Sequence, residues 1–292
     1  MTALAAPLKR SDALVEGEYA LTQRNFDHIV ALLREQSGIA LTEAKANLVY
    51  SRLAKRLRRL GLPDFDAYCA FLETPEGAEE RGEMMAALTT NVTRFFREPH
   101  HFDHLRKTLA ARLKQAAEDG VRVRLWSAAC STGEEPYSMA LTLLDLLPDA
   151  GRYDIRILAT DIDPKVVAKA RVGVYRDDAV SPIAGAMRDR WMSRESDRGE
   201  IVWRVKDEVR ALITFNELNL LGDWPMRGRF DAIFCRNVVI YFAEPTQVAL
   251  WKRFKDALAA DGRLYVGHSE RVDVPGYNSD GLTVYRLAGG SP

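Results

Sequence analysis

A run of small and acidic residues, Trp126–Ser138, offers the clearest chemistry in the sequence. The apolar stretch Val121–Trp126 predicts a buried strand, and Ser, Ala, Cys, Thr and Gly residues then form a short loop before a predicted helix. Small side chains let a loop backbone approach a ligand closely, and the start of a helix presents free N–H groups. The acids Glu134 and Glu135 would repel a pyrophosphate, but they suit a ligand with a cationic group or ribose hydroxyls. S-adenosylmethionine carries both.

A second acid follows the next predicted strand, Ile155–Thr160. Asp161 comes directly after it, and an acid at this place in an open α/β sheet can accept the ribose hydroxyls of a nucleoside. A turn or capping role for Asp161 is an equal alternative. Asp163 is expected to cap the helix that Pro164 begins.

The apolar strand predicted over Phe230–Phe234 runs into Arg236 and Asn237, and Tyr241 lies four residues further on. Ligands bind beyond the carboxyl ends of the strands in such sheets, so these side chains are candidates for a site. Taken alone, Tyr241 is better interpreted as a half-buried core tyrosine with a solvated hydroxyl.

The polar segment 89–99 joins two parts of the chain that differ in pattern. Asn91, Thr93 and Arg97 alternate with apolar residues, so they could face one pocket at a domain junction. By pattern alone, a capped linker with Phe95 and Phe96 in the core is the favoured interpretation.

Basic residues dominate the helix predicted from Thr42 to Leu60. Arg52, Lys55, Arg56 and Arg59 follow helical spacing and form one stripe. A solvated helix face is the usual meaning of such a stripe, and a docking surface for an acidic partner is the alternative. No aromatic residues are interleaved along the stripe, which argues against nucleic acid.

Three histidines, His100, His101 and His104, follow Pro99 without a nearby cysteine or paired carboxylates. This composition favours a structural role over a metal site, and no metal is expected.

The elements that must position these residues change in type near residue 90. Before it, helices are predicted after Thr22, from Thr42 to Leu60, over 64–72 and over 76–88, with no convincing strand. After it, strands are predicted over 121–126, 155–160, 213–215, 230–234, 263–267 and 282–287, with helices over 135–147, 164–170 and 245–260. This alternation predicts an α/β fold with a mainly parallel, doubly wound sheet, whose last strand can insert antiparallel. The stretch 176–212 is expected to hold a small inserted subdomain with a helix and a hairpin.

The overall composition excludes several classes of protein. The 41 basic and 41 acidic residues balance, so whole-chain charge indicates neither a nucleic-acid nor a membrane partner. The three cysteines are scattered, and no signal peptide or membrane-spanning stretch is recognised, so a cytoplasmic protein with reduced thiols is expected. Residues 1–20 are expected to form a loose lead-in.

Seven stretches together resemble the chemotaxis receptor methyltransferases, the CheR family. They fall in order over nearly the whole chain, and their joint match is specific. The stretches are 89–98 (TTNVTRFFRE), 100–102 (HHF), 126–138 (WSAACSTGEEPYS), 160–163 (TDID), 218–221 (LNLL), 230–242 (FDAIFCRNVVIYF) and 267–270 (GHSE).

The resemblance implies an S-adenosylmethionine-dependent methyltransferase fold in three parts. Residues 1–90 would be a helical receptor-docking domain and linker, residues 91–292 the S-adenosylmethionine-binding catalytic domain, and residues 176–212 an inserted β-subdomain. The family methylates glutamate side chains on the cytoplasmic helices of chemoreceptors, the methyl-accepting chemotaxis proteins, and leaves S-adenosylhomocysteine. In some members the β-subdomain captures a receptor's C-terminal peptide as an added strand, and here Gly199–Val202 could offer the edge.

The resemblance also assigns roles to single residues. Arg97 and Tyr241 match the positions proposed to lie beside the reacting methyl. Arg52, Arg56 and Arg59 are expected to contact the acidic methylation helices of the receptor. The cofactor-binding positions would be Asn91, Thr93, Arg97, Glu135, Asp161, Asn219, Leu220, Arg236 and Asn237.

Three other classes remain as alternatives. A nicotinamide-dependent reductase would share the sheet, but the first loop lacks G-x-G-x-x-G. A methyltransferase acting on another protein or on nucleic acid would share the cofactor site, although an Asn/Asp-Pro-Pro-aromatic run is expected where this chain has Arg236–Val239. A module that senses S-adenosylmethionine without transferring its methyl group is the third alternative.

Overall fold

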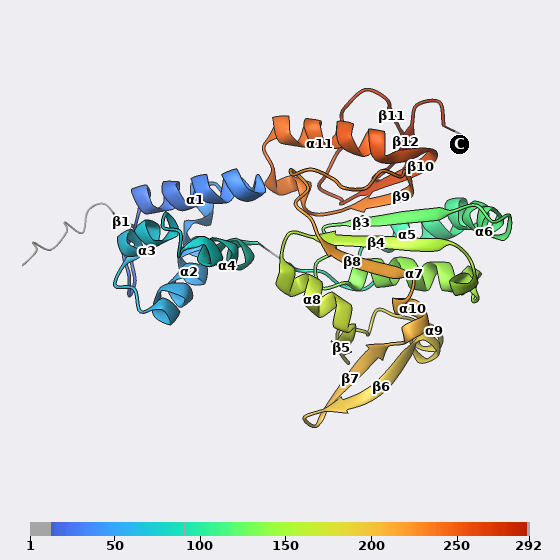
Figure 1. Ribbon diagram of the computed structural model, residues 1–292, viewed down its shortest axis with the longest axis horizontal. Coiled ribbons are helices and arrows are strands. Elements are labelled where there is room, and N and C mark those ends of the chain that lie inside the picture. The colour runs from blue at the N-terminus through green and yellow to red at the C-terminus, as the bar shows by residue number, and fades with distance from the viewer. Residues whose placement is uncertain (1–12, 90, 291–292) are drawn as a thin grey trace, which may run out of the picture. The chain divides into compact units, whose positions relative to one another are not determined.

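The computed structural model describes residues 13–89 and 91–290, and the chain divides into two compact units, Met1–Thr90 and Asn91–Pro292 (Figure 1). Most of the lead-in expected over residues 1–20, including the stretch in which no signal peptide is recognised, lies outside the described residues. Within the described parts of the chain, no helix has both the length and the apolar character needed to cross a membrane.

The first unit is built mainly from helices whose ends follow from local sequence. The side chains of Thr22 and Asn25 form a capping box at the start of the first helix, and Gly38, with φ of 74°, ends it. Asp64 caps the third helix by accepting a hydrogen bond from the backbone N–H of Ala67. The helices are α1 (Gln23–Ser37), the short turn η2 (Glu43–Lys45), α2 (Ala46–Leu60), α3 (Phe65–Leu72) and α4 (Ala78–Leu88).

The expectation of a strand-free first unit is wrong. Strand β1 (Ala13–Val15) pairs antiparallel with β2 (Leu21–Thr22), and Leu21 is fully buried. Runs of three and two residues are too short for apolar alternation to identify them in a sequence. The helix expected from Thr42 likewise begins as a 3₁₀ turn, and its α-helical part starts at Ala46.

The second unit contains a seven-stranded sheet in the order β11-β12-β10-β9-β3-β4-β8. The five strands from β10 to β8 are parallel, whereas β12 is antiparallel to β10 and β11 is antiparallel to β12, which confirms the expected antiparallel last strand. The strands are β3 (Val123–Ala128), β4 (Ile155–Asp161), β8 (Ile213–Glu217), β9 (Phe230–Cys235), β10 (Leu258–Val266), β11 (Tyr277–Gly281) and β12 (Val284–Leu287).

Helices connect the parallel strands, and a large apolar core lies between helices and sheet. Helix α7 contacts β3, β4 and β8, α8 contacts β4 and β8, and α11 contacts β10. Buried residues of β3 and β4 such as Leu125 and Ile157 belong to the same core as Leu141 of α7. The helical segments are α5 (Pro99–His104), η3 (Leu105–Leu109), α6 (Ala110–Glu118), α7 (Glu134–Leu146), η4 (Ala150–Arg152), α8 (Pro164–Val172), η5 (Val239–Tyr241) and α11 (Glu244–Ala257).

A separate three-stranded antiparallel sheet, in the order β5-β7-β6, projects beyond β8 (Figure 1). Its hairpin turns at Arg198 and Gly199, both with positive φ, as a two-residue hairpin turn requires. Strand β7 is central in this sheet, so Gly199–Val202 is not an open edge along its whole length. The elements are β5 (Val174–Arg176), α9 (Gly185–Trp191), β6 (Met192–Asp197), β7 (Glu200–Val205) and α10 (Asp207–Arg210).

Candidate functional site

The loop after β3 is held in a conformation that few residue types adopt readily. Ala129 and Ser131 have φ of 73° and 49°, and Gly133, at 96°, precedes α7. A Cβ atom on Gly133 would lie 2.9 Å from the Cβ of Ala170, so only glycine fits there. The backbone N–H groups of Ala129 and Cys130 both donate to the carbonyl of Thr160, which fixes this loop to the end of β4.

Asp161, at the end of β4, is a buried acceptor for the same loop. Its Oδ2 accepts from the backbone N–H of Ser131 at 2.7 Å, and its Oδ1 accepts from that of Asp163 at 3.1 Å. Burial raises the pKa of Asp161, while these backbone hydrogen bonds oppose the shift. The expected turn role is therefore present, and a carboxylate with two such bonds still has free lone pairs for a ligand.

Asn91 lies beside this strand end rather than out in a linker. Its Nδ2 donates to Asp163 Oδ2 at 3.1 Å, and its carbonyl accepts from Ser131 Oγ at 2.9 Å. Asp163 also caps α8 by accepting from the backbone N–H of Lys165, which confirms its expected role. The segment that begins at Asn91 is thus fixed to the ends of two strands.

Arg236, which follows β9, is a buried guanidinium between two carboxylates. Its Nη1 donates to Glu135 Oε2 at 2.9 Å and its Nη2 donates to Glu98 Oε2 at 3.1 Å. Only 2% of the Arg236 side chain is exposed, against 10% for Glu135 and 11% for Glu98. Burial raises the pKa of Glu135, and the charge of Arg236 and a hydrogen bond from Ser127 oppose this.

Glu98 also contacts the loop after β10. Its Oε1 accepts from the backbone N–H of His268 at 3.1 Å and lies 2.9 Å from the ring Nδ1 of the same residue. Burial alone would raise the pKa of Glu98, but the bonds from His268 and the charge of Arg236 outweigh it and lower the pKa to about 2. Glu98 is therefore an ionised carboxylate at neutral pH.

Glu270 holds the loop after β9 through backbone groups alone. Its carboxylate accepts from the N–H groups of Asn237, Val238, Val239 and Gly267 at 2.6–2.9 Å. Asn237 has φ of 59°, a left-handed conformation that these bonds stabilise. A Cβ on Gly267 would lie 2.5 Å from Asn237 Nδ2, so the close approach of the two loops requires glycine.

The two candidate catalytic residues are half-buried and lie on segments that contact this network. Arg97 donates from Nη1 to the carbonyl of Val92 at 2.9 Å, and its own carbonyl accepts from Nη2 of Arg236. Tyr241 ends the short helix η5, which begins two residues after Asn237. Thr93, between Asn91 and Arg97, is also half-buried.

The linker interpretation of this segment is correct for its aromatic residues. Phe95 is 1% exposed and packs edge-on against Tyr175, with ring centroids 4.9 Å apart. Phe96 packs against Phe102 at 5.2 Å, and its backbone N–H donates to Ser138 Oγ. The apolar residues therefore anchor the segment, and the polar residues Asn91 and Arg97 bond to Asp163 and to the carbonyl of Val92.

Asn219 and Leu220 follow β8. Asn219 Oδ1 accepts from the backbone N–H of Leu221 at 2.9 Å and shapes a turn. Leu220 is buried, and its carbonyl accepts from Trp224 Nε1 and from Nη1 of Arg253. Both residues lie at the carboxyl edge of the sheet, where the ends of β3, β4 and β9 also lie.

The charge at this edge is strongly negative. Every buried acid among the described residues of the second unit lies at the end of β4 or in the segments that directly follow β3, β4 and β10: Glu134, Glu135, Asp161, Asp163 and Glu270. The buried guanidinium of Arg236 pairs with one of them, Glu135, and with Glu98 as a further carboxylate. Nearby negative charge in a region of low dielectric favours a cationic ligand.

The histidine cluster has structural contacts. His101 is fully buried, its Nε2 lies 2.8 Å from Thr283 Oγ1, and its ring packs edge-on against Phe234 and Tyr265. His104 contacts the Tyr265 hydroxyl at 3.1 Å. These contacts confirm the expected structural role of the two residues.

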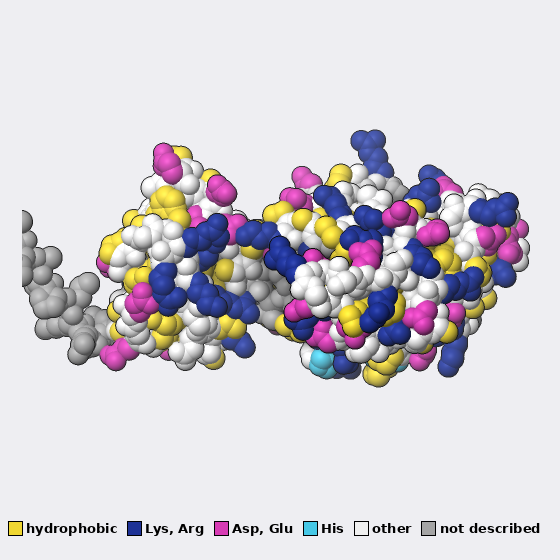
Figure 2. All heavy atoms as spheres, turned by 90° about the horizontal axis from the view of Figure 1, so that it is seen from below, with side chains coloured by type: hydrophobic (Ala, Val, Ile, Leu, Met, Phe, Trp, Pro, Cys, Tyr) yellow, Lys and Arg dark blue, Asp and Glu magenta, His cyan; other side chains and the backbone are white. Residues whose placement is uncertain are grey.

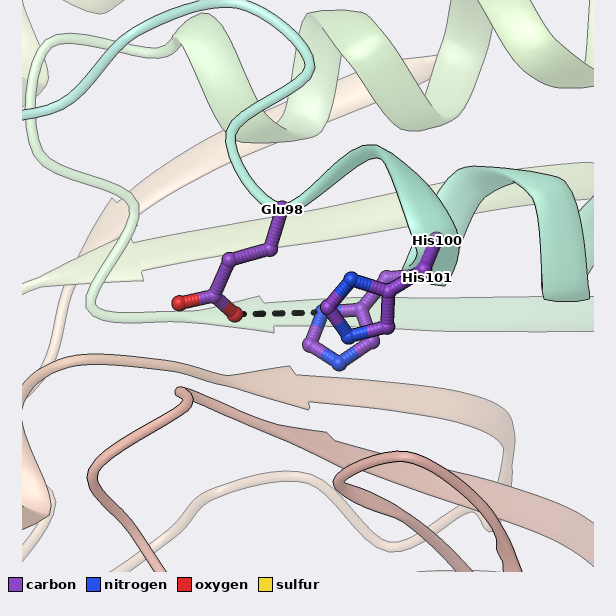
Figure 3. Close-up of side chains that lie close together, drawn as sticks. All are labelled: Glu98, His100 and His101. Carbon is purple, nitrogen blue, oxygen red and sulfur yellow. Dashed lines mark ion pairs between the residues drawn. The ribbon is translucent and has the colours of Figure 1, made fainter.

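Glu98, His100 and His101 place one potential metal-ligating atom each within 4.8 Å of one another. Figure 3 shows the Glu98 carboxylate pointing toward the two rings, with Oε2 3.5 Å from Nδ1 of His101. The same carboxylate is already bound by Arg236 and His268. The expectation of no metal stays a prediction.

The basic stripe of α2 needs correction, because two of its arginines are used inside the first unit. Arg52 donates to the carbonyls of Ala87 and Thr89, and Arg56 forms ion pairs with Glu80 and Glu83 with 14% of its side chain exposed. These partners come from α4 and the residue after it, so the sequence of α2 could not reveal them. Arg59 is exposed, as are Lys45 and Lys55, and several Lys and Arg side chains gather on this unit in Figure 2.

Sequence reasoning missed several residues that build the site: Glu98, Ser127, Ser131 and Glu270. Glu98 and Glu270 are the last residues of two of the motif stretches, and this position was the sequence signal that could have identified them. Apart from Gly267, which lies three residues before Glu270, the backbone groups that they bind lie 31 to 170 residues away, so no local pattern could assign them. Ser127 and Ser131 act on the neighbouring acids Glu135 and Asp161.

Comparison with known proteins gives consistent matches. Residues 24–89 match the family described as "CheR methyltransferase, all-alpha domain", and residues 91–280 match "CheR methyltransferase, SAM binding domain". A probable chemotaxis protein methyltransferase of Rhizobium etli is 52% identical over 258 residues, which cover 87% of this chain and 96% of that protein. The chemotaxis protein methyltransferases of Salmonella typhimurium and Escherichia coli are each 41% identical, over 92% of both chains.

Proposed function

The chain belongs to the CheR methyltransferase family, with S-adenosylmethionine as cofactor and methylation in chemotaxis as activity, and on that premise we propose that its acceptors are glutamate side chains of chemoreceptors. The proposal places the reaction in the cytoplasm, at the cytoplasmic domain of the receptor. The observation that carries it is the network around Arg236, which joins Glu135, Glu98 and the carbonyl of Arg97, and so brings three of the motif stretches to one sheet edge.

The residues of this edge fit S-adenosylmethionine. The excess of buried carboxylates suits a ligand with an ammonium and a sulfonium group, and Nε of Arg236 is buried without a hydrogen-bond partner among the described residues. Asp161 would accept the ribose hydroxyls, and Glu135 the ammonium group. The remaining contacts are assigned to Asn91, Thr93, Arg97, Asn219, Leu220, Arg236 and Asn237.

The cofactor supplies a methyl group activated by a positively charged sulfur. A glutamate acceptor has an ordinary pKa near 4.3 and is ionised at neutral pH, so the enzyme needs no general base. The main task of the site is to hold the acceptor carboxylate in line with the methyl group. Charge is neutralised as the reaction proceeds, so a site that excludes water favours it.

Two residues are assigned to the alignment of the acceptor. Arg97 would hold the glutamate through a charge-assisted hydrogen bond, and its guanidinium is half-exposed and hence reachable. A full ion pair would weaken the nucleophile, so Arg97 is expected to orient the carboxylate rather than to neutralise it. Tyr241 would orient the same carboxylate or the cofactor.

The first unit would dock on the acidic methylation helices. Of the three arginines assigned to this role, Arg59 is fully available, while Arg52 and Arg56 are engaged within the unit. We therefore propose that Arg59 makes the main contact with the receptor, with the exposed Lys55 nearby on the same helix.

A receptor C-terminal peptide would add to the small sheet as a further strand. In the small sheet, two stretches of strand have one side that does not pair with another strand of the sheet. One is the outer edge of β6, and the other is the start of β7, because β5 pairs with β7 only from Val202 to Arg204. No nucleic acid and no insertion into the membrane are part of the proposal.

Methyl-labelled S-adenosylmethionine and membranes that carry chemoreceptors would test the proposal. Label on the receptor that mild base releases as volatile methanol is the expected result, because glutamate methyl esters hydrolyse readily. Base-stable label would contradict the glutamate ester and indicate N-methylation. Absence of label, with calorimetry still showing cofactor binding, would contradict the receptor as substrate and favour a different protein substrate or a sensor.

A further inference from the structure

The backbone around Arg97 adopts a conformation that must be held in place. Phe96 and Glu98, on either side of it, have φ of 51° and 56°, in the left-handed region that non-glycine residues seldom occupy. Each is less stable than ordinary extended or helical backbone. A strained pair that flanks a proposed catalytic residue persists only where surrounding contacts fix it.

The side chain of Glu98 makes the contacts that can fix this turn. One carboxylate oxygen binds Arg236, whose guanidinium also donates to the carbonyl of Arg97. The other oxygen binds the ring and backbone of His268. Glu98 therefore links the turn at Arg97 to the loops after β9 and β10.

The charge of Glu98 matters as well as its position. Arg236 and Glu135 alone would form a neutral pair, and Glu98 adds a second carboxylate to the same guanidinium. The pKa of Glu98 is lowered to about 2, so it stays ionised throughout the range in which the protein would work. A neutral amide at this position would keep the shape of the side chain and lose the ionic contact with Arg236.

We propose that Glu98 is a positioning residue for methyl transfer, which acts by fixing the turn that carries Arg97 and the guanidinium of Arg236. This inference rests on the proposed transfer to a carboxylate. Because Arg236 keeps Glu135 when Glu98 is neutralised, most of the assigned cofactor contacts should persist, while Arg97 loses the alignment that the acceptor carboxylate needs. A misplacement of about 1 Å can lower a rate by roughly 100-fold.

The variants Glu98→Gln and Glu98→Asp test the proposal in the full-length protein. Glu98→Gln should lower kcat about 10- to 100-fold and change the Kd for S-adenosylhomocysteine, measured by calorimetry, less than about 3-fold. Glu98→Asp keeps the charge on a shorter side chain and should recover part of kcat. Glu118→Gln is the matched control, because Glu118 forms an exposed pair with Lys114 on α6 and should behave like wild type.

Two further readouts separate positioning from a loss of folded enzyme. The calorimetric stoichiometry gives the fraction of competent sites, and kcat is corrected by it. In an Arg97→Ala background, Glu98→Gln should lower kcat by less than about 3-fold, because the residue through which it acts is gone. Additive losses, or equal losses in kcat and in cofactor affinity, would overturn the proposal.

Hydrogen exchange tests the inference without any turnover. In the Glu98→Gln variant with S-adenosylhomocysteine bound, backbone amides of residues 96–98 should exchange faster than in wild type, while those of β4 should not change. Unchanged exchange at 96–98 would refute the positioning role. If wild type binds S-adenosylhomocysteine yet transfers no label to receptors, the proposed function fails, and the exchange experiment still decides the role of Glu98.

Discussion

Replacement of Arg236 by methionine should destabilise the catalytic unit by about 3–5 kcal/mol. The side chain is 2% exposed and lies between Glu98 and Glu135, which are each about a tenth exposed. Its removal leaves two nearly buried carboxylates without their cation. Two unit charges 4 Å apart interact by about 4 kcal/mol at an effective dielectric constant of 20, which matches the size of this penalty.

A double-mutant cycle separates the ion pair from the loss of packing. Glu135→Gln in the Arg236→Met background removes one of the two unpaired acids, so the double variant should be more stable than Arg236→Met alone. The coupling free energy between the two positions is expected to be about 2 kcal/mol. It is smaller than the full Coulomb energy because Glu98 remains charged in all four proteins.

Tryptophan fluorescence during urea unfolding measures this coupling in the catalytic unit alone. All five tryptophans of the chain, Trp126, Trp191, Trp203, Trp224 and Trp251, follow residue 91. Arg204→Met is the control, because Arg204 pairs with Glu195 at 2.8 Å but is 42% exposed, and it should cost less than about 1 kcal/mol. Additive effects within about 0.5 kcal/mol would refute a buried ion pair at the centre of the site.

Three further predictions concern the other residues of the two units. Tyr241→Phe should lower kcat more than it weakens cofactor binding in calorimetry, and equal losses would contradict its role beside the methyl group. Arg56→Ala should destabilise the helical unit by about 3 kcal/mol in thermal unfolding, since it leaves the buried carboxylate of Glu80 without its cation and with the Tyr68 hydroxyl as its remaining donor. Arg59→Ala should keep stability and raise KM for the receptor, and the reverse pattern would refute this division. Burial and the nearby charge of Arg236 lower the pKa of His101 to about 3, against about 6.5 in the unfolded chain. Below about pH 6.5 the unfolded chain therefore binds a proton at His101 that the folded protein does not bind. The contribution of the neutral His101 to the free energy of unfolding is complete above about pH 6.5 and falls by about 2 kcal/mol at pH 5. Urea unfolding at pH 7.5 and 5.0 measures this, and a His101→Gln variant with the same pH dependence as wild type would show that another group is responsible.

The sequence predicted elements whose signals are local and missed those whose signals are not. The first helix begins after Thr22 and Asp163 caps α8, both where expected, because a cap depends on residues within four positions. Strand β11 has the sequence YNSDG, which is turn-like, and it forms only because β12 offers an edge beside it. A strand that forms through tertiary pairing of this kind shows no alternation of apolar and polar residues in its sequence.

The residues of the site also divide into those that a local sequence signal predicts and those whose partners are distant in the sequence. Asp161 and Arg236 could be proposed from their place after apolar strands, since parallel strands end at a common edge. Whether they face a ligand or one another could not be derived, because the partners of Arg236 lie 101 and 138 residues away in the sequence. Helical spacing placed Arg56 in a basic stripe but could not predict its ion pair with Glu83 of α4, and its role in docking stays a prediction.

The buried carboxylates of the site hold strained backbone as well as charge. Seven non-glycine residues in the described chain have positive φ, and five of them lie in the site loops: Phe96, Glu98, Ala129, Ser131 and Asn237. Asp161 accepts from the N–H of Ser131, Glu270 from that of Asn237, and Arg236 donates to the carbonyl between Phe96 and Glu98. At Ser131, at Asn237 and in the turn between Phe96 and Glu98, a bond that fixes left-handed backbone is therefore also a bond of a buried charged group. The acids Asp161 and Glu270 therefore supply negative charge, which suits a sulfonium cofactor, and also hold the loop conformation on which the proposed alignment of the methyl group depends.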